Sequence, residues 1–139
     1  MDFFSSMRVS SSGLDAQMQR MNTISSNIAN AETPGYARKD PVFKANTDRE
    51  SFGEILDSNM DEAVQGVLVT EIEQDKKPPR LVYNPNHPQA NAEGYVAMPN
   101  INTVEEMANM IQAQRSYEAN VTAIQSARKM YNKALEIGR

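Results

Sequence analysis

Apolar residues recur at helical spacing near both ends of the chain. In the N-terminal segment, heptad spacing from Met7 to Ile28 gives apolar residues at five of seven positions. In the C-terminal segment, the same spacing from Met107 to Leu135 gives seven apolar residues of nine. This interval places the residues in a stripe along one side of a helix and favours coiled-coil-like pairing. The pattern therefore predicts a long amphipathic helix at each end.

These stripes are expected to meet the other helix of the chain, neighbouring copies of the chain, or both. At 1.5 Å per residue, a C-terminal helix of about 34 residues spans roughly 50 Å, which is too long for one small core to cover. The residues expected at such contacts are Leu14, Met18, Met21, Ile28, Met107, Met110, Ile111, Tyr117, Val121, Ile124 and Leu135.

Proline positions divide the chain into three segments. All seven prolines lie between Pro34 and Pro99. The sequence therefore predicts an N-terminal helical segment (1–33), a small β-rich or irregular middle domain (34–100) and a C-terminal helical segment (101–139), the two helical segments pairing as one α domain.

Helix boundaries follow from local chemistry. The first helix is expected to fray near Ala31 and to end before Pro34, because a residue that precedes proline avoids the helical region. Asn102 or Thr103 is the expected N-cap of the second helix, with acidic residues following in its first turn.

The middle of the chain predicts short strands and turns. Residues 66–73 (GVLVTEIE) are rich in β-branched residues, and residues 80–83 (RLVY) form a second candidate strand. The turn-like stretch 75–79 (DKKPP) between them predicts a hairpin. Residues 41–45 are a third candidate strand.

Two further middle segments complete the prediction. Residues 51–63 are expected to form a short helix or an ordered loop, and the turn-rich residues 84–94 an irregular loop. The predicted fold class is mainly α, with paired terminal helices and a small β-rich insert.

Composition removes several classes of function. The chain has no cysteine, which excludes disulfides, thiol catalysis and cysteine metal sites. Its net charge of −4, with both signs interspersed, offers no basic stripe to a nucleic acid. No apolar run exceeds the four residues from Tyr95 to Met98, so the sequence predicts neither a membrane span nor a cleaved secretory signal.

The sequence contains no complete motif for a metal or cofactor site. Asp57, Asn59 and Asp61 begin like a calcium loop, but Glu62 and Leu68 occupy the positions where glycine and glutamate are needed. An acidic turn is the better interpretation. The phosphate-binding glycine motifs and the nucleophile motif GxSxG are absent from the sequence.

Candidate catalytic residues are equally weak. His87, the only histidine, lies between Pro85 and Pro88, where we expect a turn or hydrogen-bonding role. A wall-cleaving enzyme would need two carboxylates in a cleft. Glu71 and Glu73 on one predicted strand are poor candidates, because we expect them to face solvent. The sequence therefore predicts no enzyme, no catalytic residue, no cofactor and no metal.

Two stretches resemble a known family. Residues 26–38 (SNIANAETPGYAR) resemble the signature of flagellar rod and hook proteins, and residues 87–121 (HPQANAEGYVAMPNINTVEEMANMIQAQRSYEANV) are similar to the C-terminal region of proximal rod proteins. Residues 78–88 (PPRLVYNPNHP) fit the same family. The residues that carry the resemblance are Asn27, Asn30, Pro34, Gly35, Tyr36, Gly94, Tyr95, Pro99, Asn100, Arg115, Tyr117 and Asn120.

The resemblance does not decide what the residues that carry it do. The group from Asn27 to Tyr36 shapes the exit of the first helix, either as a turn that caps the core or as a partner contact. Arg115, Tyr117 and Asn120 serve either contact between subunits or helix pairing within one chain.

The resemblance implies a structural subunit of the flagellar proximal rod. Such a subunit is exported by the flagellar type III apparatus without cleavage, assembles into a helical tube in the periplasm and transmits motor torque. The implied partners are other copies, other rod proteins, the rod base with its membrane ring and the export apparatus, with no nucleic acid or small-molecule substrate. The alternatives are another rod protein of this axial family or a non-flagellar coiled-coil adaptor, which would leave the TPGY and PNxN motifs unexplained.

Overall fold

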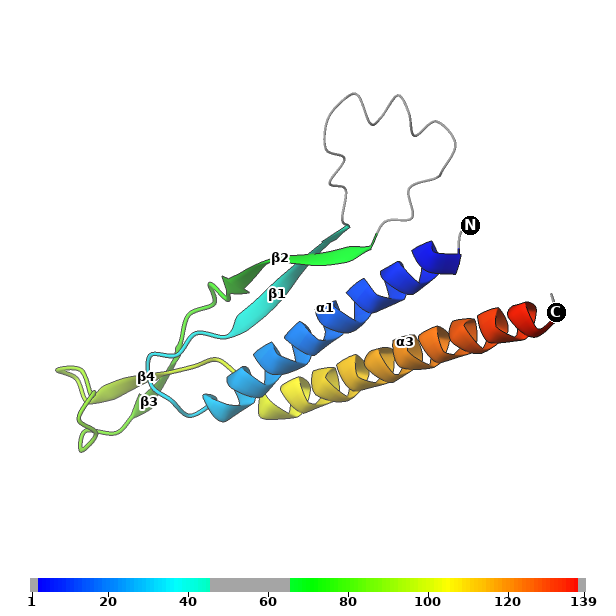
Figure 1. The fold of residues 1–139 in the computed structure, drawn as a ribbon. Helices are drawn as coiled ribbons and strands as arrows, with labels where there is room; N and C mark the ends of the chain where they lie inside the picture. Colours follow the sequence, from blue (N-terminus) through cyan, green and yellow to red (C-terminus); the bar gives the residue numbers. More distant parts are fainter. Residues whose placement is uncertain (1–2, 46–65, 138–139) are drawn as a thin grey trace, which may run out of the picture.

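Two long antiparallel helices form the body of the molecule (Figure 1). The computed structural model describes residues 3–45 and 66–137. Helix α1 spans Phe3–Ala29 and helix α3 spans Thr103–Ile137. The end of α1 lies beside the start of α3, where an Asn27 to Glu106 hydrogen bond of 3.2 Å joins them. The predicted fold class is confirmed.

The end of α1 and the start of α3 lie near the predicted positions. α1 ends at Ala29, and the amide side chain of Asn30 closes the end by donating to the carbonyl of Ser26 at 2.8 Å. At the start of α3, the Asn102 side chain accepts a hydrogen bond from the Val104 backbone N–H at 3.1 Å. Asn102 is therefore the N-cap, as its residue type and position predicted.

Helix α3 is the longer of the two, with 35 residues against 27 in α1. Its C-terminal turns accordingly extend beyond the start of α1 (Figure 1). In the described part of the chain, neither helix has the length and apolar content needed to cross a membrane.

The strands form two separate antiparallel pairs. β1 (Lys39–Ala45) pairs with β2 (Val67–Gln74), with an irregularity between Val42 and Phe43. β3 (Arg80–Tyr83) pairs with β4 (Tyr95–Met98). In Figure 1 the first pair lies along α1, and the second lies beyond the end of the helix pair at which α3 begins.

The hairpin predicted between residues 66–73 and 80–83 is wrong. The two strands belong to different sheets, because the chain does not turn back after β2. Pro78 and Pro79 have no N–H to donate to a ladder and favour an extended path. Before them, the Asp75 backbone N–H donates to the Arg38 carbonyl at 2.7 Å, which continues the β1–β2 pairing.

The other predictions for the middle of the chain had mixed outcomes. The strand at residues 41–45 is confirmed within β1, whereas β4 was not predicted as a strand. The irregular loop at residues 84–94 is confirmed; there the His87 ring accepts a hydrogen bond from the Gln89 N–H at 3.2 Å. The segment 51–63, with its calcium-loop-like residues, lies outside the described residues.

The described core is small and unusually polar. Among the side chains that the structure describes, five apolar ones are buried: Ala16, Ile24, Val96, Pro99 and Ala113. Three polar ones are buried as well: Thr23, Asn27 and Glu106. With so little apolar burial, hydrogen bonding must specify much of how the elements fit together.

Two glycines occupy backbone conformations that other residues adopt at a cost. Gly35 has φ of 79° and Gly94 has φ of 81°. A Cβ on Gly35 would meet open space, whereas a Cβ on Gly94 would lie 2.9 Å from a ring carbon of Tyr83. An added side chain would therefore strain the backbone at both positions, but it would overlap with a neighbouring atom only at position 94.

We expect Gly35→Ala to lower the free energy of unfolding by about 1 kcal/mol, through the left-handed backbone conformation. Gly94→Ala should lower it by about 2 kcal/mol or more, because the overlap adds to the same strain. Urea unfolding followed by circular dichroism measures both. Equal losses for the two variants would show that the overlap at Tyr83 is relieved without cost.

Candidate functional site

The turn after α1 docks onto β4. The Gly35 backbone N–H donates to the Ala97 carbonyl at 3.1 Å, and the Tyr36 N–H donates back to the Thr33 carbonyl at 3.2 Å. The positive φ of Gly35 lets the chain reverse here without a steric penalty. The TPGY motif therefore joins the N-terminal half of the chain to its C-terminal half.

Asn27 is fully buried and uses its complete hydrogen-bonding capacity. Its amide group donates to the Lys39 carbonyl at 2.8 Å and to a Glu106 carboxylate oxygen at 3.2 Å. Its carbonyl oxygen accepts from the Lys39 backbone N–H at 2.9 Å and from the Tyr36 hydroxyl at 3.1 Å. One side chain thus connects α1, the turn, β1 and α3.

Glu106 is the buried acidic partner of this asparagine, with 1% of its surface exposed. Its second carboxylate oxygen accepts a hydrogen bond of 2.8 Å from Nε of Arg38. Arg38 also pairs with the exposed Asp40. A buried carboxylate is tolerated only when it is paired, and both of its oxygens have donors here.

Arg38 remains charged in this setting. Burial opposes its charge, but the hydrogen bond to Glu106 and the negative charges of Asp40 and Glu106 outweigh that effect and raise the pKa of the guanidinium. Glu106 therefore faces a permanent cation.

We call Asn27, Arg38 and Glu106 the polar cluster. Asn27 was among the predicted signature residues, whereas Arg38 and Glu106 were not selected as site residues. Glu106 was expected only as an acidic residue of the first helical turn, which is usually solvated. The sequence did contain one signal. Glu106 lies seven residues before Ala113, so the two residues share one side of the helix, and the structure places that side against α1.

The remaining signature residues shape the strands and the helix contact. Pro99 is buried and Tyr95 is 38% exposed, its ring packed edge-on against Tyr83 at 5.3 Å. Asn120 lies against Gly13, where an added Cβ would come within 3.0 Å of its side-chain nitrogen. Asn100, Asn30, Pro34 and Arg115 are exposed or half-buried.

The predicted stripe residues divide into two groups by exposure. Seven are half-buried: Leu14, Met21, Ile28, Met110, Tyr117, Val121 and Ile124. Four are exposed, by 46% to 56% of their surface: Met18, Met107, Ile111 and Leu135. None of the eleven is fully buried. The buried residues among those described in the helix pair are Ala16, Thr23, Ile24, Asn27, Glu106 and Ala113, of which Ile24 alone is large and apolar.

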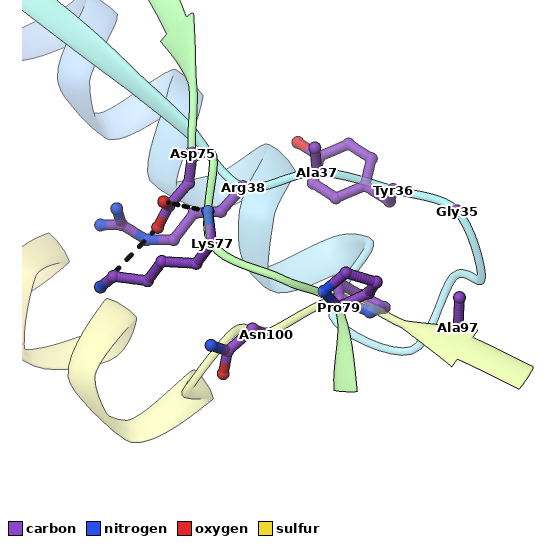
Figure 2. Close-up of a pocket in the computed structure, with 10 residues that line it drawn as sticks. Gly35, Tyr36, Ala37, Arg38, Asp75, Lys77, Pro79, Ala97 and Asn100 are labelled. Carbon is purple, nitrogen blue, oxygen red and sulfur yellow. Dashed lines mark hydrogen bonds and ion pairs between the residues drawn. The ribbon is translucent and has the colours of Figure 1, made fainter. Parts of the chain in front are cut away.

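A small pocket of about 170 Å³ lies between the turn and the strands (Figure 2). Asp75 and Lys77 line one side, where the Lys77 N–H donates to Asp75 at 3.0 Å and the two side chains form a loose ion pair of 3.9 Å. The other lining residues are Gly35, Tyr36, Ala37, Arg38, Pro79, Ala97, Pro99 and Asn100. This lining contains no histidine, cysteine, serine or threonine.

Other catalytic or metal arrangements are not formed by the described residues. Glu71 and Glu73 are both exposed on β2, as expected of solvent-facing residues. Within residues 3–45 and 66–137, no group of three or more histidine and acidic side chains is arranged to hold a metal ion.

Comparison with known proteins gives a consistent result. Residues 7–36 match the family described as "Flagella basal body rod protein", and residues 92–137 match "Flagellar basal body rod FlgEFG protein C-terminal". The chain is 43% identical to the "Flagellar basal-body rod protein FlgC" of Bacillus subtilis, over the full length of both. It is 42% identical to the protein of that name from Borreliella burgdorferi, covering 99% of this chain and 98% of the relative. Against the Escherichia coli O6:H1 protein the identity is 36%, covering 94% of each.

The contacts of the polar cluster predict a measurable change in the free energy of unfolding. Glu106→Gln should lower the free energy of unfolding by about 1–3 kcal/mol, because Arg38 loses its buried anion and an amide cannot accept from both donors equally well. Glu105→Gln is the matched control: the neighbouring residue shares the first helical turn but is exposed, so its loss should stay within about 0.5 kcal/mol. Urea unfolding of both variants tests this, and equal losses would contradict it.

Proposed function

The chain belongs to the flagellar basal-body rod protein family and is a structural subunit of that rod, and we propose that it takes the place in the proximal rod that its relatives named FlgC take in theirs. The observation that carries this is the likeness to those relatives along the whole chain. The family is structural, and its membership places the chain in the flagellar basal body.

Assembly with other rod components is a property of the family. The specific partners are part of our proposal. They are further copies of this chain, other rod proteins, the rod base with its membrane ring and, during secretion, the flagellar export apparatus. The proposed location is the periplasmic rod, reached without a cleaved signal, and the proposed work there is transmission of motor torque. These parts rest on the family relationship.

The exposed stripe of α3 supports contacts between subunits. Val104, Met107 and Ile111 are exposed by 73%, 54% and 54%, and their spacing of three and four residues places them on one face of the helix. On α1, Met18 adds an exposed apolar side chain between the half-buried Leu14 and Met21. Apolar surface of this kind is stabilised when a neighbour covers it.

A rod requires a particular type of contact. Subunits of an open helical tube meet through two different surfaces, since a contact between identical surfaces closes into a dimer. We propose that the exposed stripes of α1 and α3 form one of these surfaces. The half-buried members, Met110, Tyr117, Val121 and Ile124, then serve mainly the pairing of α3 with α1.

Deletion of the gene tests the function directly. We expect the source bacterium to lose motility and its basal bodies, imaged by cryo-electron tomography, to retain membrane rings with a missing or truncated rod. The point of truncation would locate the subunit. Complete rods and hooks in the deletion strain would overturn the proposal and favour the adaptor alternative.

A surface variant separates assembly from folding. Ile111→Glu should leave the circular dichroism spectrum and the urea midpoint of the purified chain nearly unchanged, because the side chain is already half exposed. In the deletion strain it should fail to restore motility, since it places a charge in an apolar contact. Gln112→Glu, an exposed neighbour, is the control and should restore motility. Full motility with Ile111→Glu would exclude this face from the interface.

A further inference from the structure

One stripe of α3 that faces α1 carries small side chains, and these discriminate poorly between alternative registers. On α3, Ala113, Asn120 and Ala127 recur every seven residues along the side that meets α1. A slip of the helices by seven residues would exchange alanine for asparagine or the reverse, next to small partners such as Gly13. Such a slip moves one helix along the other by about 10 Å and keeps this stripe on the side that faces α1, because seven residues are close to two helical turns.

Glu106 is the member of this stripe that has no equivalent seven residues further on. After the slip, Ala113 would stand where Glu106 stands now, opposite Asn27. The buried amide of Asn27 would lose one acceptor, and the Arg38 guanidinium would lose its buried carboxylate and keep only the exposed Asp40. A buried donor left without a partner is costly, so the slipped register is penalised at this one place.

The cluster also connects the helix register to the first strand. The backbone N–H and carbonyl of Lys39, the first residue of β1, both hydrogen-bond to the Asn27 side chain. Arg38, immediately before it, carries both the bond to Glu106 and the carbonyl that accepts from the Asp75 N–H. The strand pair is therefore attached to the helices at the point where their register is fixed.

We propose that the polar cluster sets the register of the helix pair, selecting one antiparallel alignment of α1 and α3 and holding β1 to it. Buried ion pairs add little net stability compared with apolar residues of similar volume. Their best established use is to specify register, at some cost in stability. The inference rests on the geometry of the chain and is independent of its place in the flagellum.

Distances between spin labels test the register. Because the chain has no cysteine, Gln19→Cys and Gln112→Cys place one label on each helix, at exposed positions. Pulsed electron resonance on full-length chain, diluted with unlabelled chain to suppress signals between copies, should give one narrow distance. In Arg38→Met/Glu106→Met, which removes both charges and retains side-chain volume, we expect a second distance population from the slipped register.

The control is Glu105→Met, which removes an exposed charge from the adjacent position and should keep the single distance. If the double variant loses its helical circular dichroism, Glu106→Gln decides the question by the same measurement. A second distance in whichever variant remains helical supports the proposal. A single unchanged distance in that variant would overturn it and leave the polar cluster as a local stabilising contact.

Discussion

A buried carboxylate, Glu106, is the point on which the described structure depends. It receives hydrogen bonds from Asn27 of α1 and from Arg38 at the entrance to β1, so a side chain of α3 meets two elements that lie far from it in sequence. Removing a carboxylate from water is expensive, and the cost is offset only when both oxygens find donors. That requirement is geometrically strict, whereas an apolar contact tolerates sliding. The arrangement of helices and first strand thus follows from the need to satisfy one charge.

The family signature acquires a physical meaning in this setting. Asn27 is retained in the interior because it satisfies four hydrogen bonds at once, and Gly35 is needed because the turn adopts a positive φ and docks on β4. Tyr36 contributes its hydroxyl to Asn27, while its ring lies under the Lys39 ammonium group at 5.6 Å. These residues shape the exit of the first helix within a single chain.

Among the described residues, the fully buried positions of the helix pair are mostly small or polar, and Ile24 is the large apolar exception. Several larger apolar residues, such as Met107 and Ile111, face outward. In an isolated protein this would leave apolar surface exposed to water. In a subunit of a rod, the same residues are available to neighbours, so assembly would complete the burial that the single chain lacks.

Sequence alone determined the elements that depend on local chemistry. The apolar spacing predicted both helices, Asn102 or Thr103 was the predicted start of α3, and residue types predicted the TPGY turn and the described strands other than β4. Strand partners and the buried face of each helix were decided by the tertiary structure. Residues 80–83 pair with 95–98 rather than with β2, and the buried Glu106 is paired with Arg38, which lies 68 residues away in sequence. Periodicity reports which residues share a face, but the partner of that face is set by contacts between distant residues, which no local pattern encodes.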